Sequence, residues 1–261
     1  MGKLGIDPAL LRRFERELDP RHPERCAIPT QVLGYGEIST VMQIGTSAEN
    51  PLAYKRLPLF RTEEEAERYE ALYWDYVHVL EKRVGTRVAA SEMVRLVDEE
   101  KGRVTVYIAQ EQLPFDAIGH RAIHHLQPDQ VQTLFLAVLT EIGRVFAFNR
   151  RHASTLEIGF DGQISNWALA DVASVLPGQE IPLIYLDTST PLMQCDGQEQ
   201  LDPNLFLRSA PSFLVWVLRL LFVQDVMTRY YDQRKVTLDL IANFYKEQRP
   251  ELVPALVEVA N

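Results

Sequence analysis

Ile158-Gly-Phe-Asp161-Gly-Gln-Ile-Ser-Asn166-Trp-Ala-Leu169 is the stretch of this 261-residue chain that decides how the rest is interpreted. An aspartate and an asparagine with four residues between them lead into an apolar run. Further on, Asp187 ends the β-type run Leu183-Ile-Tyr-Leu. Metal-dependent phosphoryl transfer needs one carboxylate at the attacking hydroxyl, and an amide oxygen with a second carboxylate at Mg²⁺. Taken alone, the spacing also fits an Asx-rich hairpin loop, because turns use both residue types freely.

Composition indicates an ordinary soluble globular protein that forms one large domain or two intimate lobes. Apolar residues make up 46% and charged residues 24% of the chain, and the formal net charge of −9 disfavours a nucleic-acid partner. Cys26 and Cys195 suit a reducing compartment rather than a disulfide framework. The most apolar stretch, residues 213–225, contains Arg219 and is too short to span a bilayer. With no apolar signal region at the N-terminus, we expect a cytoplasmic protein without membrane association.

The first part of the chain predicts a helix followed by three strands. Residues 8–18 form an amphipathic pattern with Asp7 as N-cap and Pro8 at the first helical position. Two short β-type runs then flank a glycine pair within residues 31–45. Such a turn lets backbone N–H groups approach phosphates, although a plain hairpin has the same residues. The third strand covers residues 51–57 and holds Lys55 within an apolar run.

Lys55 has two interpretations. In one it lies on an edge strand and points to solvent. In the other it reaches nucleotide phosphates while paired with a carboxylate of the next helix, because a charge among apolar residues needs a partner. That helix begins with Thr62 as N-cap and Glu65 at the capping-box position and runs to about Lys82. Glu67 and Glu70 are its two available partners for Lys55.

Beyond this helix, residues 93–97 and 103–109 predict a β-hairpin around the turn at 98–102. The second strand runs into Gln110-Glu-Gln-Leu-Pro114. The pattern then becomes helical, with a 3.6-residue period over 129–149 and further helical runs at about 203–232 and 235–246. The sequence therefore predicts a five-stranded sheet with one long helix, followed by a mainly helical part.

In chain order these features are a glycine turn, a strand lysine, a glutamate-bearing helix, a hairpin, a connecting segment, a long helix, Asp-x4-Asn and a strand-terminal Asp. Their order and context over residues 29–190 resemble the protein-kinase-like fold, and within it the aminoglycoside/choline-kinase type of small-molecule phosphotransferase. The resemblance implies an α+β, bilobal fold: an N-lobe at 1–110, a hinge at 111–115 and a helical C-lobe at 116–261.

The resemblance also implies a role for each motif residue. Asp161 would be the catalytic aspartate, and Asn166 and Asp187 would hold Mg²⁺. ATP would be bound by the remaining positions, with Glu70 preferred to Glu67 as the partner of Lys55 and with the Glu111 carbonyl and the Leu113 N–H receiving the adenine edge. These nucleotide-binding positions are Gly34, Gly36, Ser39, Lys55, Glu70, Gln110, Glu111 and Leu113.

The sequence departs from the family pattern at three places. Gly159-Phe160 precedes Asp161 where the small-molecule enzymes commonly have His-Gly, Thr188-Ser189 follows Asp187 in place of Phe-Gly, and Ser39 replaces a third glycine. The main hypothesis is transfer of the γ-phosphate of Mg-ATP to a hydroxyl of a small-molecule acceptor. A catalytically quiet, kinase-like nucleotide-binding or scaffold protein and an atypical protein or peptide kinase are the alternatives.

Two segments are open to interpretation as an acceptor site. The cluster Tyr230-Tyr231-Asp232-Gln-Arg234 is equally consistent with an ordinary helix end. Residues 191–211 contain Asp196, Glu199 and Asp202, which would suit a cationic or polyhydroxyl acceptor but also fit a solvated loop.

Overall fold

A computed structural model describes residues 4–35, 39–46, 51–98, 102–172, 175–176, 179–202, 204–205 and 228–260. The chain divides into two compact units. Unit 1 consists of Met1–Ala71, Ala89–Gln112 and Asp202–Arg219, and unit 2 of Leu72–Val88, Leu113–Leu201 and Leu220–Asn261.

The framework of unit 1 is an antiparallel five-stranded sheet with the order β1-β2-β3-β5-β4. Its strands are β1 (Thr30–Tyr35), β2 (Thr40–Ile44), β3 (Leu52–Phe60), β4 (Ser91–Asp98) and β5 (Arg103–Glu111). β3 continues to Phe60 rather than ending near Leu57, because the register shifts between Leu57 and Phe60. That irregularity accommodates Pro58, which has no N–H to donate to a ladder.

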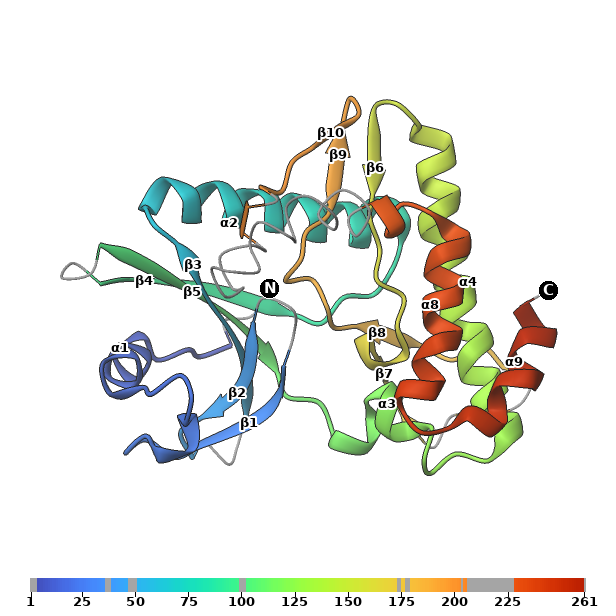
Figure 1. Ribbon diagram of the computed structural model, residues 1–261, viewed down its shortest axis with the longest axis horizontal. Helices are drawn as coiled ribbons and strands as arrows, with labels where there is room; N and C mark the ends of the chain where they lie inside the picture. Colours follow the sequence, from blue (N-terminus) through green and yellow to red (C-terminus); the bar gives the residue numbers. More distant parts are fainter. Residues whose placement is uncertain are drawn as a thin grey trace, which may run out of the picture. The chain divides into compact units, whose positions relative to one another are not determined.

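The two faces of this sheet carry different helices (Figure 1). Helix α1 (Pro8–Glu17) packs Leu11 and Phe14 against one face, in a core shared with Tyr54 and Tyr107. Side chains alternate between faces along a strand. The neighbours of these core residues, including Lys55, therefore face the other side, where α2 (Glu63–His78) begins.

A partly buried ion pair ties α1 to the sheet. The Arg56 guanidinium donates to both carboxylate oxygens of Glu15, from Nε at 2.5 Å and from Nη2 at 3.0 Å. The Tyr107 hydroxyl donates to the same carboxylate at 2.5 Å. Burial and the Glu15 charge raise the pKa of Tyr107, so its hydroxyl stays a donor. Asp7 caps α1 as predicted, accepting hydrogen bonds from the Ala9 and Leu10 N–H groups.

The predicted helix from Thr62 is confirmed, and it ends differently from its pattern. Thr62 Oγ1 accepts the Glu65 N–H at 3.2 Å, while the Glu65 carboxylate accepts the Arg61 N–H rather than the Thr62 N–H. After His78 the chain forms a π-helical turn, η2 (Val79–Val84), that stops at Gly85 with φ of +89°. This left-handed position is one that glycine adopts without strain.

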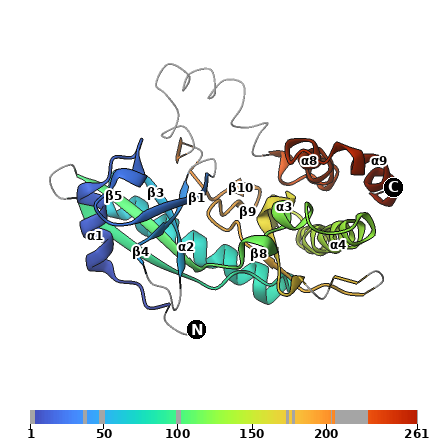
Figure 2. The ribbon, with the colours of Figure 1, turned by 90° about the horizontal axis from the view of Figure 1, so that it is seen from below.

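Unit 2 is built around helix α4 (Pro128–His152), which the apolar period predicted. Helix α8 (Gln233–Lys246) packs along it, with the rings of Phe135 and Phe244 6.1 Å apart, and α9 (Val253–Ala260) follows (Figures 1 and 2). The shorter helical segments, which connect these helices and the strands, are η1 (Pro23–Arg25) in unit 1 and η3 (Phe115–Ala117), α3 (Gly119–Ala122), η4 (Ile164–Asn166) and η6 (Pro250–Leu252) in unit 2.

Two small antiparallel sheets complete unit 2. β6 (Leu156–Ile158), β9 (Met193–Cys195) and β10 (Gln198–Glu199) form one, in the order β10-β9-β6. β7 (Trp167–Leu169) and β8 (Leu183–Tyr185) form the other. The predicted α+β class is confirmed, with a small antiparallel sheet and one long helix followed by a mainly helical part.

Several predictions lie outside the described residues: most of the helical run at 203–232, the apolar stretch at 213–225 and the centre of the turn at 98–102. Within the described residues, α4 is the one helix long and apolar enough to cross a membrane by length and composition, with a mean hydropathy of 1.5. Half of that stretch is buried in the protein, as also occurs in core helices. The predicted boundaries 1–110, 111–115 and 116–261 stay a prediction.

Candidate active site

The β7–β8 pair brings Asn166 and Asp187 together. Trp167 pairs with Tyr185 in this antiparallel ladder, so Asn166, just before β7, lies opposite the residues that follow β8. The Leu186 N–H donates to the Asn166 carbonyl at 2.8 Å, which extends the pairing by one step. The asparagine and the aspartate that the sequence separates by twenty residues thus become neighbours through strand register.

Asp161 joins the same group through its backbone. Its carbonyl oxygen accepts one hydrogen bond from Asn166 Nδ2 and one from the Tyr185 hydroxyl, each at 3.2 Å. Because the Asn166 amide nitrogen is used in this way, its Oδ1 is turned away from the Asp161 carbonyl. The structure therefore collects Asp161, Asn166 and Asp187 at one end of the β7–β8 pair.

The residues after Asp187 are buried and hydrogen-bonded, which gives a physical account of the Thr188-Ser189 departure. The Ser189 hydroxyl donates to Asp187 Oδ1 at 2.8 Å. Thr188 Oγ1 and the Tyr73 hydroxyl lie 3.0 Å apart within unit 2. Both hydroxyls serve to fix the chain that carries the Asp187 carboxylate.

The Gly159-Phe160 departure is explained by packing. Phe160 is fully buried and stacks on Tyr185, with ring centroids 4.6 Å apart, and meets Trp167 at 5.8 Å. A Cβ on Gly159 would lie 2.7 Å from Leu192 Cβ, so a larger residue does not fit there without a shift. An aromatic cluster thus supports the loop where the family pattern has a histidine, and Trp167 is a core residue.

The electrostatics of this group suit a cation. Burial raises the pKa of Tyr76, and the charges of Asp187 and Asp161 raise it further. Burial likewise raises the pKa of Tyr185, with contributions from Tyr76 and the same two carboxylates. Both phenols therefore stay neutral beside the Asp161 and Asp187 carboxylates. One carboxylate and one carboxamide are hard oxygen donors of the kind that Mg²⁺ uses together with phosphate and water.

A dedicated protein cage for a metal is absent from the part of the chain that the structure describes, since no group of three or more His, Cys, Asp and Glu side chains gathers there. Mg²⁺ needs no such cage, because it keeps several water ligands and binds only one or two protein oxygens. Asn166 and Asp187 are the residues that would hold it.

In unit 1, Lys55 lies in the middle of the sheet. Its strand β3 runs between β2 and β5, where Lys55 pairs with Val41 on one side and Ile108 on the other. The side chain is only 8% exposed. The edge-strand interpretation is therefore wrong, and the lysine is a buried cation on the face that α2 covers.

Arg95 on β4 binds both glutamates considered for Lys55. Arg95 Nη1 lies 2.8 Å from Glu67 Oε1, and Arg95 Nε lies 3.1 Å from Glu70 Oε2. Arg95 shares the sheet face of Lys55, because Met93 pairs with Ile108 and lies two residues earlier on the same strand. The sequence analysis missed Arg95, and the pairing of Lys55 with Glu70 stays a prediction.

The remaining nucleotide-binding predictions fall on β1, β2 and β5. Gly34 lies at a register shift in β1, and a Cβ added there would meet no atom within 4 Å. Ser39 is buried, and Gly36 lies outside the described residues. Gln110, also buried, pairs with Ala53 on β3 and Ser91 on β4, and Glu111 ends β5. Among the described residues, no backbone carbonyl outside the helices and strands accepts a hydrogen bond from the Leu113 N–H.

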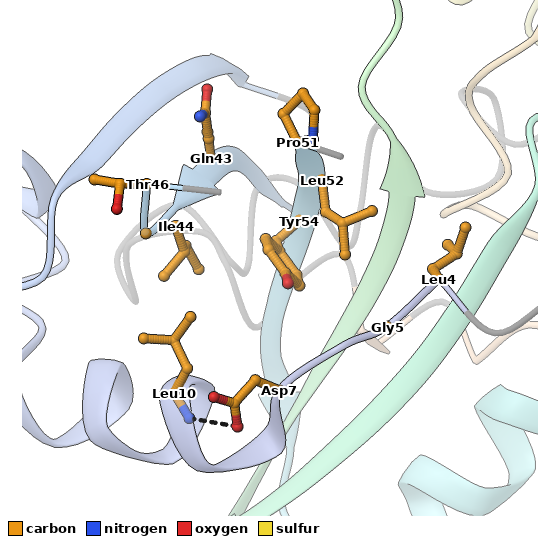
Figure 3. A pocket seen from close by; sticks show the side chains of 11 residues that line it. Leu4, Gly5, Asp7, Leu10, Gln43, Ile44, Thr46, Pro51, Leu52 and Tyr54 are labelled. Atoms are coloured by element: carbon orange, nitrogen blue, oxygen red, sulfur yellow. Dashed lines mark hydrogen bonds between the residues drawn. The ribbon is translucent and has the colours of Figure 1, made fainter. Parts of the chain in front are cut away.

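A cavity of about 300 Å³ in unit 1 is separate from these residues. It lies between the N-terminal segment and the ends of β2 and β3, with Asp7, Leu10, Ile44 and Tyr54 in its wall (Figure 3). None of the predicted site residues lines it within the described chain.

Both segments that the sequence left open as an acceptor site contact the loop that carries Asp161, since the Gly159 N–H donates to the Leu192 carbonyl at 2.9 Å. The Phe160 N–H donates to the Tyr230 carbonyl at 2.9 Å, and a Cβ on Gly159 would lie 3.1 Å from the Tyr231 ring. The Tyr231 hydroxyl donates to Glu199 Oε2 at 2.8 Å, and burial raises the pKa of Glu199. Tyr231 and Glu199 thus meet beside Gly159 and Phe160, the two residues that precede Asp161.

Two further residues hold the catalytic loop and were not identified from the sequence. Asn149 on α4 donates from Nδ2 to the Ile158 carbonyl at 2.8 Å and accepts the Ile158 N–H at 2.9 Å. Gln163 donates to both carboxylate oxygens of Asp161. A buried asparagine within an apolar helix period was the available signal for the first. Gln163 had none, since it sits in an irregular loop.

Comparison with known proteins places the sequence in a family. The profile of DUF6206, a family of unknown function, matches residues 21–261. The chain belongs to this family. No curated protein matches this chain.

Solved structures with a similar course of the chain include three that cover nearly all of it. "WaaP in complex with acyl carrier protein" is 12% identical and has a TM-score of 0.36, with 94% of this chain and 96% of that chain covered. "Structure of the GDP and kanamycin complex of APH(2")-IIia" is 9% identical, with a TM-score of 0.41 and 97% of both chains covered.

The third is "Structure of the GDP complex of wild-type aminoglycoside 2'-phosphotransferase-IIIa", at 9% identity and a TM-score of 0.43, with 95% of this chain and 96% of that chain covered. An aminoglycoside phosphotransferase is the type of protein that the motifs resemble. With TM-scores below 0.5, these matches assign no role to any residue of this chain.

Proposed function

We propose that this protein is a Mg²⁺-dependent phosphotransferase that moves the γ-phosphate of ATP to a hydroxyl of a small-molecule acceptor. The observation that carries the proposal is the β7–β8 ladder, which sets Asn166 beside Asp187 and, through two hydrogen bonds, beside Asp161. An Asx-rich hairpin has no need of a second aspartate, Asp187, at the same place. Free cysteines at positions 26 and 195 support a cytoplasmic setting for the reaction.

Each residue has a defined task in the proposed reaction. Asp161 accepts the proton of the acceptor hydroxyl as that oxygen attacks the γ-phosphorus, and the bond from the γ-phosphorus to the bridging oxygen breaks to release ADP. Asn166 and Asp187 hold Mg²⁺, which when bound neutralises charge on the phosphate oxygens. Lys55, buried on the sheet face covered by α2, supplies the cation for the nucleotide phosphates. Gly34 offers open space next to its backbone, as close approach of a phosphate requires.

Nucleotide binding is tested first. Mg-ATP and Mg-GTP are titrated against the purified protein by calorimetry and by thermal unfolding, because a ligand of the native state raises the melting temperature as its concentration rises. Asp187→Asn should abolish the Mg²⁺ dependence of binding. The absence of heat and of any thermal shift at millimolar Mg-ATP and Mg-GTP would contradict the proposal, whereas a shift with GTP alone would change only the nucleotide.

Turnover is tested with a pool of hydroxyl-bearing metabolites, in which the acceptor is found by the mass increase of a phosphoryl group. Asp161→Asn should lower turnover by about 10²–10⁴-fold with nucleotide affinity nearly unchanged, as expected for a general base. The matched control is Asp129→Asn, which makes the same change at an exposed aspartate in the first turn of α4 and should leave turnover unchanged. Equal loss of ATP affinity in Asp161→Asn and Asp187→Asn would show that Asp161 is misassigned.

A second function, nucleotide binding without transfer, is favoured by one observation. Arg95 holds Glu67 and Glu70, the two carboxylates considered for Lys55. If that arrangement persists with nucleotide bound, Arg95 keeps both glutamates and neither takes the place that the family pattern gives to the lysine's partner. Saturable Mg-ATP binding combined with no phosphorylated product from any acceptor pool would support this alternative.

A further inference from the structure

Gln163 occupies both oxygens of the proposed base. Its backbone N–H donates to Asp161 Oδ1 at 3.1 Å, and its side-chain Nε2 donates to Asp161 Oδ2 at 3.2 Å. Two donors from one residue restrict rotation of the carboxylate about its Cβ–Cγ bond. The direction in which the Asp161 carboxylate points is therefore set by where the Gln163 side chain is held.

Asn243 holds that side chain from helix α8. Asn243 Nδ2 lies 3.3 Å from Gln163 Oε1, across eighty positions of sequence. Asn243 is only 3% exposed and lies on the helix face that buries Val236, Leu240 and Phe244. A polar side chain there costs free energy unless it is hydrogen-bonded, and Asn is a poor helix former.

Chemistry fixes which group donates and which accepts in the hydrogen bonds that link Asp161, Gln163 and Asn243. An ionised carboxylate accepts and never donates, so Gln163 has to present its Nε2 to Asp161 and its Oε1 to Asn243. Asn243 then has to present its Nδ2, and its own Oδ1 is buried without a hydrogen-bond partner among the described residues. The amide of Asn243 is thus oriented for Gln163 at the expense of its own oxygen.

We infer that Gln163 and Asn243 form a positioning pair that orients the Asp161 carboxylate toward the acceptor hydroxyl. This inference rests on the proposed function for its chemical meaning. The pair supplies from α8 the support that the missing loop histidine would give, while Phe160 supports the same loop by packing. The inference gives Gln163 and Asn243 a role through Asp161 alone.

Two nearly isosteric variants separate positioning from packing. Asn243→Asp replaces a donor by an acceptor, so Gln163 turns its amide to donate to position 243 and presents its oxygen to Asp161. Asn243→Leu removes the donor and leaves Gln163 able to keep its bond to Asp161. We expect kcat to fall by about 10²-fold in Asn243→Asp and by clearly less in Asn243→Leu, with the KM for ATP unchanged in both.

The control is Leu238→Asp, which adds the same charge to α8 at an exposed position and should leave kcat unchanged. A role in packing alone predicts the opposite order, with turnover following thermal stability. Equal or greater loss of kcat in Asn243→Leu would overturn the inference. If Asn243→Asp does not fold, Gln163→Leu at its half-buried loop position gives the same test, and unchanged turnover in that variant overturns it.

A readout without turnover separates this inference from the proposed function. The Gln163 side-chain amide resonance is identified in a ¹H–¹⁵N correlation spectrum by its loss in Gln163→Leu. It should shift in Asp161→Asn and in Asn243→Asp, and stay in place in Leu238→Asp. A wild-type protein that shows these shifts and phosphorylates no acceptor would refute the function and keep the pair. A Gln163 amide resonance that shifts in neither Asp161→Asn nor Asn243→Asp would refute the positioning pair, whatever the activity of the protein.

Discussion

Replacing Phe160 by alanine tests the support of the catalytic loop directly. The ring is fully buried against Tyr185 and Trp167, so its removal leaves a cavity beside Asp161. A buried Phe→Ala change costs about 3–5 kcal/mol, of which each aromatic pair accounts for about 0.5–1.5 kcal/mol. Such a loss is a large fraction of the roughly 5–15 kcal/mol that stabilises a typical domain.

The assay is urea unfolding followed by tryptophan fluorescence. An unchanged slope m shows that the variant still unfolds in the same two-state transition as wild type. Phe160→Leu, which keeps most of the volume, should cost less than about 1.5 kcal/mol. The control is Phe115→Ala in the same unit. That ring is 59% exposed and lies over Arg121, so its loss should cost no more than about 1 kcal/mol.

The reasoning fails if Phe160→Ala is no more destabilising than Phe115→Ala, because the ring would then not be packed as described. It also fails in its functional part if Phe160→Ala, assayed where it is fully folded, turns over at the wild-type rate. The loop would then hold Asp161 without the aromatic cluster.

Three further predictions concern the fold around the site. Glu15→Gln should lower the free energy of unfolding by about 3 kcal/mol, because it leaves Arg56 as a partly buried and uncompensated charge; a Tm equal to that of wild type would show that α1 is not held by this pair. Asn149→Leu should cost about 2–4 kcal/mol, since the N–H and C=O of Ile158 both lose a buried partner; native-state hydrogen exchange at Ile158 should accelerate, and unchanged protection would contradict the anchor. Glu199 has a pKa raised by burial, so its contribution to stability is complete below the ordinary glutamate pKa of about 4.3 and is lost as pH rises through the raised folded value. Glu199→Gln should therefore gain stability relative to wild type as pH increases from 4 to 8, and a difference that stays constant over that range would refute this assignment.

Local sequence signals predicted the elements well where each element depends on its own residues. Asp7 and Pro8 place the start of α1, and the apolar period gives α4 almost in full. β3 extended beyond its prediction, because a bulge absorbed Pro58 and only the partner strand reveals a bulge. The sequence did not predict that the helix after His78 becomes π-helical. This turn ends at Gly85, which adopts a left-handed conformation.

The sequence alone indicated the group Asp161, Asn166 and Asp187 but not the residues that support it. The spacing of Asp161, Asn166 and Asp187 and the β-type runs beside them can be recognised in a single sequence. Arg95 approaches Glu67 and Glu70 from another strand, and Asn243 reaches Gln163 from a distant helix. Such pairs depend on tertiary packing, which no window of neighbouring residues reports. The structure does explain one departure from the kinase-like pattern, because Phe160 packs on Tyr185 and Trp167 and so supports the loop that lacks the histidine.

The β7–β8 ladder has a consequence for the kinds of genetic change that this site tolerates. Asn166 and Asp187 meet because Trp167 pairs with Tyr185, so their alignment is encoded by a count of positions. A deletion of one codon within either strand shifts the count by one and turns each following side chain to the opposite face. A change in length between Leu169 and Leu183 leaves the count within each strand intact. Variation among relatives should therefore appear as insertions between the two strands and as substitutions, but not gaps, inside them.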